Sequence, residues 1–546
     1  MTGFKEITMG GLLRETEAKF SEIEALICPE FGVRETYAEF LGSCTKVAKG
    51  FMAIGVEKGD RVSVWATNVP QWLHLQFGLG MIGAVLVTVN INYKSHELEY
   101  ILNQSDSTTL VHVERYRKTS FSQIVAEVVP ETENGKVSSD RLPRLKHVIR
   151  IGDGTDPGKS MSFDEILRLG ETISDEDLEE RERSLDTNDV INMQYTSGTT
   201  GFPKGVMLTH RNIINNAIMS GEVLGMQAGD RMLLQVPLFH CYGCVTTSLS
   251  SVSHGVTMVV LEGFDPFKAL ECIEKERCTL INGVPTMFIA IMSHPDFKKY
   301  DMTSLKAGSM AGAPCPEETM RGVMTSMHCP EITIAYGATE TSPVITMTRR
   351  NDPVDLRVAT VGKTLDGIEC RIADPETGKP LPPNTQGEIV SRGPCIMAGY
   401  YKMPGATAEI LDADGWLHTG DLGVMNENGY FRITGRIKDM IIRGGENIYP
   451  REIEEFLHTH PKVKDVYVVG VPDERYGEQV LASIELKDGA EATAEELIAF
   501  CDGKIARHKV PKYWEFNTPM PMTASGKVQK FKLAEQFVRR QGNRAA

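Results

Sequence analysis

Short apolar runs that alternate with amphipathic segments are the feature of this sequence that most limits what it can fold into. From about residue 60, the apolar run RVSVWA is followed by the segment QWLHLQFGLGMIGA after Pro70, and then by the apolar run VLVTVN. The two short runs predict β-strands, and the segment between them predicts a helix. Strand–helix–strand alternation at this spacing predicts a mainly parallel sheet with helices on both faces.

The alternation continues along most of the chain, with one interruption. The segment SHELEYILNQS predicts a capped helix and TTLVHV another strand, whereas residues 154–189 end in a charge-dense segment that predicts a solvated helix and connector. The pattern then returns, which predicts a second sheet layer of related design. Its strand candidates are RMLLQV, VTMVVLE, TLING, LKAGSM and EITIAY.

The sequence changes character from about Gly362, where shorter β runs are broken by Gly and Pro. Runs such as IECRIAD, GEIVSRG and YFRITG predict a small antiparallel barrel or sheet. A final unit begins near GRIKDMIIRGGENIYP and mixes helical with strand-like segments, which predicts a compact α+β domain. The predicted fold class is α/β: a large N-terminal domain of two α/β layers, a small β-barrel subdomain and a C-terminal α+β domain.

Composition and charge exclude several classes of protein. A chain of 546 residues needs at least two domains, and its net charge of −15 argues against a nucleic-acid partner, because binding to a phosphate backbone needs a basic face. Eleven cysteines without regular spacing, and an N-terminus without a secretory signal, indicate a reducing cytoplasm. No apolar run approaches the roughly 20 residues of a membrane span. We therefore expect a soluble cytoplasmic protein.

One loop carries the residue types of a phosphate site. The segment YTSGTTGFPKGVMLTH (195–210) combines hydroxyl side chains, glycines that let backbone N–H groups approach a ligand, and the cation of Lys204. It does not fit the P-loop pattern, because Phe202 and Pro203 separate the second glycine from the lysine. On these residues alone, an ordinary turn between the strand DVINMQ and the helix HRNIINNAIM is the alternative.

Five motifs, in order, resemble those of the adenylate-forming superfamily, which contains acyl-CoA synthetases, firefly luciferases and the adenylation domains of peptide synthetases. They are YTSGTTGFPKG (195–205), YGATE (336–340), TGD (419–421), GRIKDMIIRGGENIYP (435–450) and PMTASGKVQK (521–530). The resemblance covers nearly the whole chain. Within the superfamily, the sequence resembles medium-chain acyl-CoA synthetases of the family-member-2 group. It implies an AMP-binding domain over residues 1–437 and a mobile lid domain, with the catalytic lysine, over residues 438–546.

The resemblance implies a reaction in two halves. A carboxylate attacks the α-phosphate of Mg²⁺-bound ATP to give an acyl-adenylate and pyrophosphate, and the thiol of coenzyme A then displaces AMP. The implied catalytic residues are Lys527, Thr196 and Glu340, of which Glu340 coordinates Mg²⁺, a role that suits a hard carboxylate. The implied ATP-binding residues are Thr196, Ser197, Gly198, Thr199, Thr200, Gly201, Lys204, Gly312, Ala313, Pro314, Tyr336, Gly337, Thr339, Asp421 and Arg436.

The resemblance also implies sites for the other two substrates. The implied acyl pocket consists of Phe239, His240, Cys244, Ser309 and Val344, and the implied coenzyme A channel and hinge consist of Lys438, Gly444, Gly445 and Glu446. We expect His240 to be a neutral pocket wall, because a carboxylic acid is already ionised at pH 7 and no proton has to be removed. The pocket region lacks the aspartate of peptide-synthetase adenylation domains, which favours an uncharged medium-chain or compact acyl group.

Two further patterns predict structure rather than chemistry. The run GLGMIG (78–83) matches a dinucleotide-binding pattern, but it lies inside a predicted helix, so we expect these glycines to serve helix packing. The pair CYGC (241–244) has no second pair at zinc-binding spacing.

The function implied is therefore ATP-dependent, AMP-forming ligation of a carboxylic acid to coenzyme A, and the sequence leaves a homodimer open. Three alternatives are an enzyme that delivers acyl groups to a carrier protein, a luciferase-like oxygenase, and a catalytically inactive nucleotide-binding relative. Intact residues at the key positions of the five motifs argue against the last. These are Lys204, Glu340, Asp421, Arg436 and Lys527.

Overall fold

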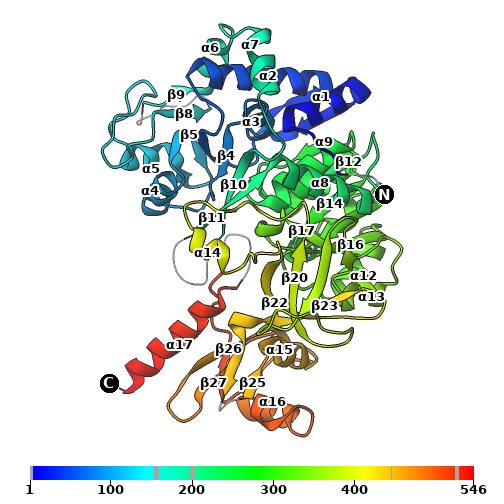
Figure 1. Cartoon of the computed structure of the whole chain (residues 1–546). Coiled ribbons are helices and arrows are strands. Elements are labelled where there is room, and N and C mark those ends of the chain that lie inside the picture. The colour runs from blue at the N-terminus through cyan, green and yellow to red at the C-terminus, as the bar shows by residue number, and fades with distance from the viewer. Residues whose placement is uncertain (1–3, 153–158, 197–202, 444–445, 523–527, 546) are drawn as a thin grey trace. The chain divides into compact units, whose positions relative to one another are not determined.

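The computed structural model describes residues 4–152, 159–196, 203–443, 446–522 and 528–545, and the chain divides into two compact units (Figure 1). The first unit consists of Met1–Cys370 and Ser391–Leu417, and the second of Arg371–Val390 and His418–Ala546. The backbone therefore passes from one unit to the other three times.

An eight-stranded sheet of the first unit contains the strands predicted from the opening alternation. In sheet order the strands are β21 (Gly399–Tyr400), β11 (Lys204–Thr209), β10 (Val190–Thr196), β4 (Val85–Thr88), β3 (Arg61–Trp65), β5 (Ser107–Val113), β8 (His147–Ile151) and β9 (Met161–Ser162). The pairs from β10 to β9 are parallel, as predicted, whereas β11 runs antiparallel to β10 and β21 antiparallel to β11.

A nine-stranded sheet forms the second layer of this unit. In sheet order the strands are β18 (Lys363–Thr364), β17 (Val344–Met347), β16 (Glu331–Gly337), β15 (Ala307–Met310), β14 (Leu280–Gly283), β12 (Arg231–Leu234), β13 (Thr257–Val260), β1 (Glu24–Cys28) and β2 (Val33–Thr36). All pairs from β16 to β1 are parallel, and the strands at the two edges are antiparallel to their neighbours.

Helices cover both faces of the nine-stranded sheet, because its side chains alternate between two cores. Leu26 and Leu234 belong to a core that also contains residues of α1, α2, α3, α8 and the eight-stranded sheet, whereas their neighbours Ile27 and Leu233 pack with α10, α11 and α12. The helices are α1 (Met9–Phe20), α2 (Tyr37–Ala53), α3 (Pro70–Met81), α4 (Ser95–Gln104), α5 (Phe121–Val128), α6 (Phe163–Gly170), α7 (Asp175–Arg183), α8 (His210–Leu224), α9 (Ser250–Ser253), α10 (Pro266–Lys275), α11 (Pro285–Met292), α12 (Glu317–Thr325), α13 (Val354–Ala359) and α14 (Pro404–Ala408).

Two glycines of the GLGMIG run serve helix packing, as predicted, whereas Gly83 lies beyond the end of α3 with a φ of +70° and was wrongly placed inside the helix. Both Gly78 and Gly80 lie within α3. A Cβ atom on Gly78 would lie 2.7 Å from the Cys44 carbonyl oxygen of α2, and one on Gly80 would lie 2.8 Å from Met9 of α1. Side chains at these positions would force the helices apart.

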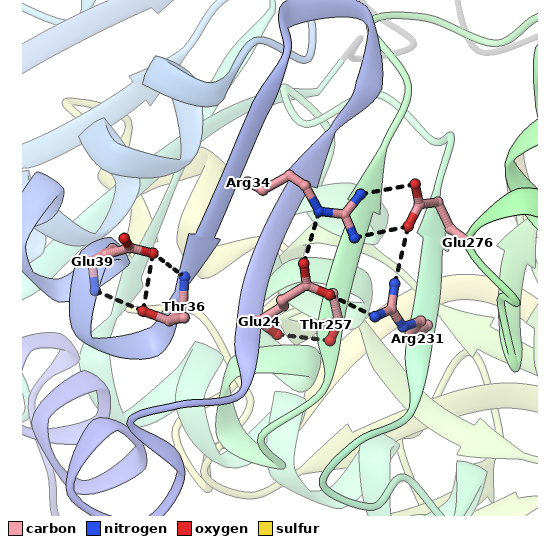
Figure 2. Close-up of polar contacts among 7 residues, drawn as sticks. All are labelled: Glu24, Arg34, Thr36, Glu39, Arg231, Thr257 and Glu276. Carbon is pink, nitrogen blue, oxygen red and sulfur yellow. Dashed lines mark hydrogen bonds and ion pairs between the residues drawn. The ribbon is translucent and has the colours of Figure 1, made fainter.

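A network of charges joins the amino ends of the strands in the nine-stranded sheet (Figure 2). Arg34 donates to Glu24 Oε1 at 2.8 Å and to both carboxylate oxygens of Glu276 at 2.9 and 3.1 Å. Arg231 contacts the same two carboxylates, at 2.5 Å on Glu24 and 3.0 Å on Glu276. The Thr257 hydroxyl donates to the Glu24 carbonyl at 2.7 Å, so three strand starts and the end of α10 are held together.

The same edge continues with paired charges toward β16. Lys306, just before β15, lies 2.7 Å from Asp230 just before β12, and the Thr279 hydroxyl donates to Asp230 at 2.9 Å. Glu331, the first residue of β16, pairs with Arg350 at 2.7 Å. Each parallel strand of this sheet therefore starts at or beside a polar contact to a neighbour.

The second unit contains residues 438–546, which form an α+β structure as predicted, together with the small β region that precedes them. A four-stranded sheet with the order β19 (Glu369–Ala373), β20 (Gly387–Arg392), β22 (Leu417–Met425) and β23 (Phe431–Arg436) forms the predicted small β region. A second sheet contains β25 (Glu446–Ile448), β24 (Ile441–Arg443), β27 (Gly477–Leu486) and β26 (Val463–Asp473), with β28 (Tyr513–Phe516) also paired to β27. The helices are α15 (Pro450–His458), α16 (Ala494–Cys501) and α17 (Lys530–Ala545).

In the described parts of the chain, none of the helices combines the length and the apolar character that a bilayer crossing requires.

Candidate functional site

The implied adenine and metal residues lie at the carboxyl edge of the nine-stranded sheet. β15 ends at Met310, directly before residues 311–314, and β16 ends at Gly337, directly before the short 3₁₀ turn η4 (Thr339–Thr341) that contains Glu340. β15 and β16 are neighbouring parallel strands, so the two loops leave the sheet side by side. In open α/β sheets, ligands bind where loops leave the carboxyl ends of the strands.

The loop after β15 is exposed, as access for a nucleotide requires. The loop after β16 has no space for a side chain at Gly337. Gly312, Ala313 and Pro314 are all exposed, and Gly312 has a φ of +83°, which favours glycine. A Cβ atom on Gly337 would lie only 1.9 Å from the Pro343 carbonyl oxygen, so this position has no room for a side chain.

Tyr336 and Thr339 flank that glycine, and both are half-buried. Tyr336 is on β16, and the Thr339 hydroxyl lies 3.7 Å from the thiol of Cys241. The YGATE loop is thus connected to the segment that follows the PLFH sequence.

The phosphate loop is part of a β-hairpin rather than a direct strand-to-helix turn. Thr196 and Lys204 are cross-strand partners of β10 and β11, and α8 begins only after β11 ends at Thr209. The predicted residues Ser197, Gly198, Thr199, Thr200 and Gly201 lie outside the described residues. The sequence did not identify KGVMLT as a strand, because its apolar residues are consecutive rather than alternating.

Lys204 and Glu340 are brought together by Tyr400, a residue that the sequence analysis missed. The Tyr400 hydroxyl donates to Glu340 Oε1 at 2.7 Å, and Lys204 Nζ lies 4.8 Å from the centre of the Tyr400 ring. Burial, followed by the Glu340 carboxylate, raises the pKa of Tyr400, so the phenol stays neutral and can donate. No motif marks Tyr400, and only the pairing of β21 with β11 places it there.

Glu340 fits a role as a Mg²⁺ ligand. Mg²⁺ is usually held by one or two carboxylates together with substrate phosphates and water, rather than by a cage of protein ligands. Among the described residues, no cluster of three or more His, Cys, Asp or Glu forms such a cage. A single half-buried carboxylate near Lys204, with one oxygen already oriented by a phenol, matches the sparse pattern that Mg²⁺ prefers.

The residues of the implied acyl pocket divide into buried and accessible groups. Cys244, Ser309 and Val344 are buried, and Cys244 lies on the π-helix η2 (Tyr242–Leu249). Long π-helices are rare, and π-type turns are frequent at functional sites. Phe239 is half-buried and His240 is exposed.

Several side chains of the implied acyl pocket are held by hydrogen bonds. The backbone N–H of Tyr242 donates to His240 Nδ1 at 3.2 Å, so that ring nitrogen carries no proton, in keeping with the neutral imidazole we expect. The Ser309 hydroxyl donates to Asn282 at 2.8 Å and lies 2.8 Å from the Tyr242 hydroxyl. Gln194, which lies next to the phosphate loop in the sequence, donates to the Cys244 sulfur at 3.0 Å.

A side-chain amide fixes the PLFH segment that carries Phe239 and His240. Asn68 donates to the carbonyls of Val236 and Leu261 at 3.0 and 3.1 Å, and its oxygen accepts from the Leu238 N–H at 2.9 Å. One buried asparagine therefore anchors the loop after β12, and no sequence pattern predicts this role.

In the second unit, Asp421 and Arg436 form an ion pair. They face each other on β22 and β23, with Arg436 Nε 2.7 Å from Asp421 Oδ1. The Asp421 side chain is 8% exposed and that of Arg436 58% exposed, so a buried carboxylate is presented beside an accessible guanidinium. The Thr419 hydroxyl accepts from the Asp421 N–H at 3.1 Å and donates to the Ile389 carbonyl at 2.6 Å, which fixes the TGD turn.

The remaining implied residues of this unit are only partly described. Lys438 is exposed in the 3₁₀ turn η5 (Ile437–Asp439), directly after β23. Lys530, the lysine nearest to the motif lysine, is 2.7 Å from Glu454 and is occupied in that pair. Lys527, Gly444 and Gly445 lie outside the described residues, as does the side chain of Glu446.

Comparison with protein families gives two matches. The model for AMP-binding enzymes matches residues 13–401, and the model for the C-terminal domain of AMP-binding enzymes matches residues 452–527. The chain is 52% identical over 534 residues to the YngI protein of Bacillus subtilis (strain 168), with 97% of each chain covered. It is 42% identical over 541 residues to the human mitochondrial medium-chain acyl-CoA ligase ACSF2, with 97% of this chain and 88% of the relative covered.

Solved structures give a consistent result. An anthranilate CoA ligase, AuaEII, in complex with anthranoyl-AMP superposes with a TM-score of 0.85 at 26% identity, covering 98% of each chain. ATP-bound MatB from Rhodopseudomonas palustris superposes with a TM-score of 0.80 at 28% identity, covering 97% of this chain and 99% of MatB.

Proposed function

Because the chain belongs to the AMP-binding enzyme family and is an AMP-forming acyl-CoA synthetase that uses ATP, Mg²⁺ and coenzyme A, we propose that its substrate is a medium-chain or compact carboxylic acid. The observation that carries the proposal is the grouping of Lys204, Tyr400 and Glu340 beside the exposed loop 311–314. It combines a cation from β11 of the eight-stranded sheet, for the phosphates, with a carboxylate for Mg²⁺ and an accessible nucleotide surface at the carboxyl edge of the nine-stranded sheet.

In this proposal the first unit binds and activates ATP. Lys204 and the loop from Thr196 hold the β- and γ-phosphates, and Glu340 holds Mg²⁺, which neutralises charge on the phosphates. Tyr336 and the backbone of residues 312–314 contact adenine. Fixed cations and donors of this kind stabilise the negative charge that develops when the carboxylate attacks the α-phosphate.

The second unit, in the proposal, supplies the ribose contacts, which precede the hinge at Lys438, and the lysine beyond the hinge that moves between the two half-reactions. Asp421 accepts hydrogen bonds from the ribose hydroxyls, and Arg436 contacts the ribose or phosphate. Lys527 reaches the reacting carboxylate and α-phosphate during adenylation. Lys438 acts as the hinge between domains 1–437 and 438–546. Gly444, Gly445 and Glu446 then face the coenzyme A thiol channel.

The proposed acyl pocket has uncharged walls. Cys244 and Val344 are buried, and the amide that donates to Nδ1 of His240 favours a neutral imidazole. A pocket with these walls accepts an uncharged acyl chain, which agrees with the medium-chain ligase named among the relatives. A chain-length preference would come from packing, since one methylene is worth about 1–3 kcal/mol in such a pocket.

The proposal also includes a cellular location and an oligomeric state. We place the enzyme in the cytoplasm, because all eleven cysteines are free, as is usual in a reducing compartment. A homodimer remains part of the proposal, and size-exclusion chromatography with light scattering would test it.

The experiment that tests the function is a panel of acids from C2 to C16, with benzoate and cyclohexane carboxylate, assayed for pyrophosphate, AMP and thioester. We expect coenzyme A-dependent AMP release with medium-chain acids. Pyrophosphate exchange without any thioester would instead favour transfer to a carrier protein. ATP binding with no response to any acid would contradict the substrate class proposed here.

A further inference from the structure

Tyr400 lies between the two groups of the first unit that the proposed function assigns to the phosphates and to Mg²⁺. Its hydroxyl contacts Glu340, its ring face contacts Lys204, and the residue is 7% exposed. A neutral aromatic ring can attract a cation on its face while its hydroxyl donates at its edge, so one side chain contacts both groups.

The backbone around Tyr400 is attached to both partners. The Tyr401 N–H donates to the Gly205 carbonyl at 2.8 Å, next to Lys204, and the Met397 N–H donates to the Glu340 carbonyl at 3.0 Å. The Tyr400 N–H itself donates to the Thr407 hydroxyl at 2.9 Å. The segment 397–401 is therefore a short brace between β11 and the turn η4.

We propose that Tyr400 is a positioning residue for the adenylation half-reaction, which orients the Glu340 carboxylate toward Mg²⁺ and holds Lys204 near the phosphates. This inference rests on the proposed function. The bond to Oε1 restricts rotation of the half-buried Glu340 carboxylate and therefore the positions that Oε2 can take. Outer partners of this kind typically change metal affinity by about 10–100-fold when they are removed.

Tyr400→Phe is the primary test, because it removes the hydroxyl and retains the ring over Lys204. We expect the Mg²⁺ concentration for half-maximal ATP binding, measured by calorimetry at constant ATP, to rise by about 10-fold. ATP binding without Mg²⁺ should be unchanged. In turnover, the KM for Mg²⁺-bound ATP should rise, while thioester formation from supplied acyl-adenylate and coenzyme A should keep its rate.

Tyr401→Phe is the matched control, since it deletes the same atom from the adjacent residue. The Tyr401 hydroxyl donates to Asp106 at 2.9 Å, away from Glu340. We expect no change in the Mg²⁺ dependence for this variant. An equal rise in both variants, or no rise in Tyr400→Phe, would overturn the proposal.

Two further variants keep the test decisive. In a Glu340→Gln background, Tyr400→Phe should change the Mg²⁺ dependence less than about 2-fold, because the two residues act as one unit, whereas a full additional 10-fold change would show that Tyr400 acts elsewhere. Thr407→Val removes the backbone anchor of Tyr400 and should shift the Mg²⁺ dependence in the same direction by a smaller factor, even if Tyr400→Phe does not fold.

Different experimental results would contradict the positioning role of Tyr400 and the proposed function. If the native enzyme makes no thioester from any acid but its ATP binding depends on Mg²⁺ and on Tyr400, the substrate proposal is wrong and the positioning role stands. If thioester forms and Tyr400→Phe binds Mg²⁺ and ATP like the native enzyme, only the positioning role is wrong.

Discussion

The two edges of the nine-stranded sheet have opposite characters. At the amino edge, Arg34 and Arg231 share the carboxylates of Glu24 and Glu276, so the charges are paired with one another. At the carboxyl edge, the loops after β15 and β16 expose residues 312–314 and place Glu340 beside Tyr400 and Lys204. One edge uses its charges to join strands, and the other, in the proposed function, uses them to bind ATP and Mg²⁺.

The effects of substitutions at the two edges should therefore be separable. The amino-edge charges satisfy one another within the sheet and bear on stability, whereas the side chains of Glu340 and Lys204 share the Tyr400 contact. We therefore expect amino-edge variants to change unfolding and carboxyl-edge variants to change the reaction. Four perturbations of the protein test that separation.

Glu340→Gln should cause the largest effect. It keeps the size of the side chain and an oxygen for the Tyr400 hydroxyl, but it removes the negative charge that would hold Mg²⁺. Since metal-ion stabilisation of developing charge is worth several kcal/mol, we expect pyrophosphate release to fall by about 1,000-fold. Thermal unfolding should change by less than about 2 °C. A large loss of stability together with activity would contradict the separation of the two edges.

Low pH should lower the stability of the first unit, because His210 becomes protonated. This effect limits the pH range in which variants at the two edges of the sheet can be compared. Burial lowers the pKa of His210 from its ordinary 6.5 to about 4, and the Met9 N–H donates to its Nδ1 at 3.0 Å. Because folding disfavours the protonated imidazole, its contribution to stability is complete above pH 6.5 and is lost as the pH falls toward 4.

The loss from His210 should reach about 3 kcal/mol, since one pKa unit corresponds to about 1.4 kcal/mol. Denaturant unfolding at a series of pH values measures it. His210→Asn lowers stability at neutral pH but cannot titrate, so its stability should fall less between pH 6.5 and 4.5. An unchanged pH dependence in that variant would rule out His210 as the cause.

Arg231→Met should lower the free energy of unfolding by about 1–2 kcal/mol, between the values for exposed and fully buried ion pairs. The substitution leaves Arg34 as the partner of both carboxylates in Figure 2, which limits the loss. The kcat for thioester formation should stay within about 2-fold. Arg277→Met is the control: its pair with Asp301 is exposed, and its removal should cost less than about 0.5 kcal/mol.

Thr36→Ala should have the smallest effect, about 1 kcal/mol, because it removes the side-chain cap of α2. The Thr36 hydroxyl accepts from the Glu39 N–H, and the Glu39 carboxylate accepts from the Thr36 N–H at 2.8 Å (Figure 2). Thr36→Ser retains the cap and should restore most of the stability. Equal melting temperatures for the Ala and Ser variants would show that the cap contributes nothing.

Local patterns were sufficient to predict much of this fold. The strands β3, β4 and β5 and the helix α3 follow from apolar runs and periodicity, and the packing role of Gly78 and Gly80 follows from their position inside a helix. The place of Glu340 follows as well, because YGATE comes directly after an apolar strand. These features depend on neighbours in the sequence.

The contacts that the sequence did not predict join distant segments. Tyr400 meets Glu340 because β21 pairs with β11 and Met397 bonds to the Glu340 backbone, and Asn68 anchors the PLFH segment from far along the chain. The hairpin of β10 and β11 is the exception, since its strands are close in sequence; β11 carries consecutive rather than alternating apolar residues and so no strand period. Long-range pairing leaves no periodic signal within either partner.

The late position of β21 sets an order of events during synthesis of the protein. Until Gly399 and Tyr400 leave the ribosome, β11 has an unpaired edge and Glu340 lacks its phenol donor. About 190 residues separate the end of β11 from the start of β21, so at about 5–20 residues per second the nascent chain carries this open edge for about 10–40 s. Slow translation between these points would prolong exposure of an aggregation-prone edge, and a nascent chain cut short before residue 399 would retain it.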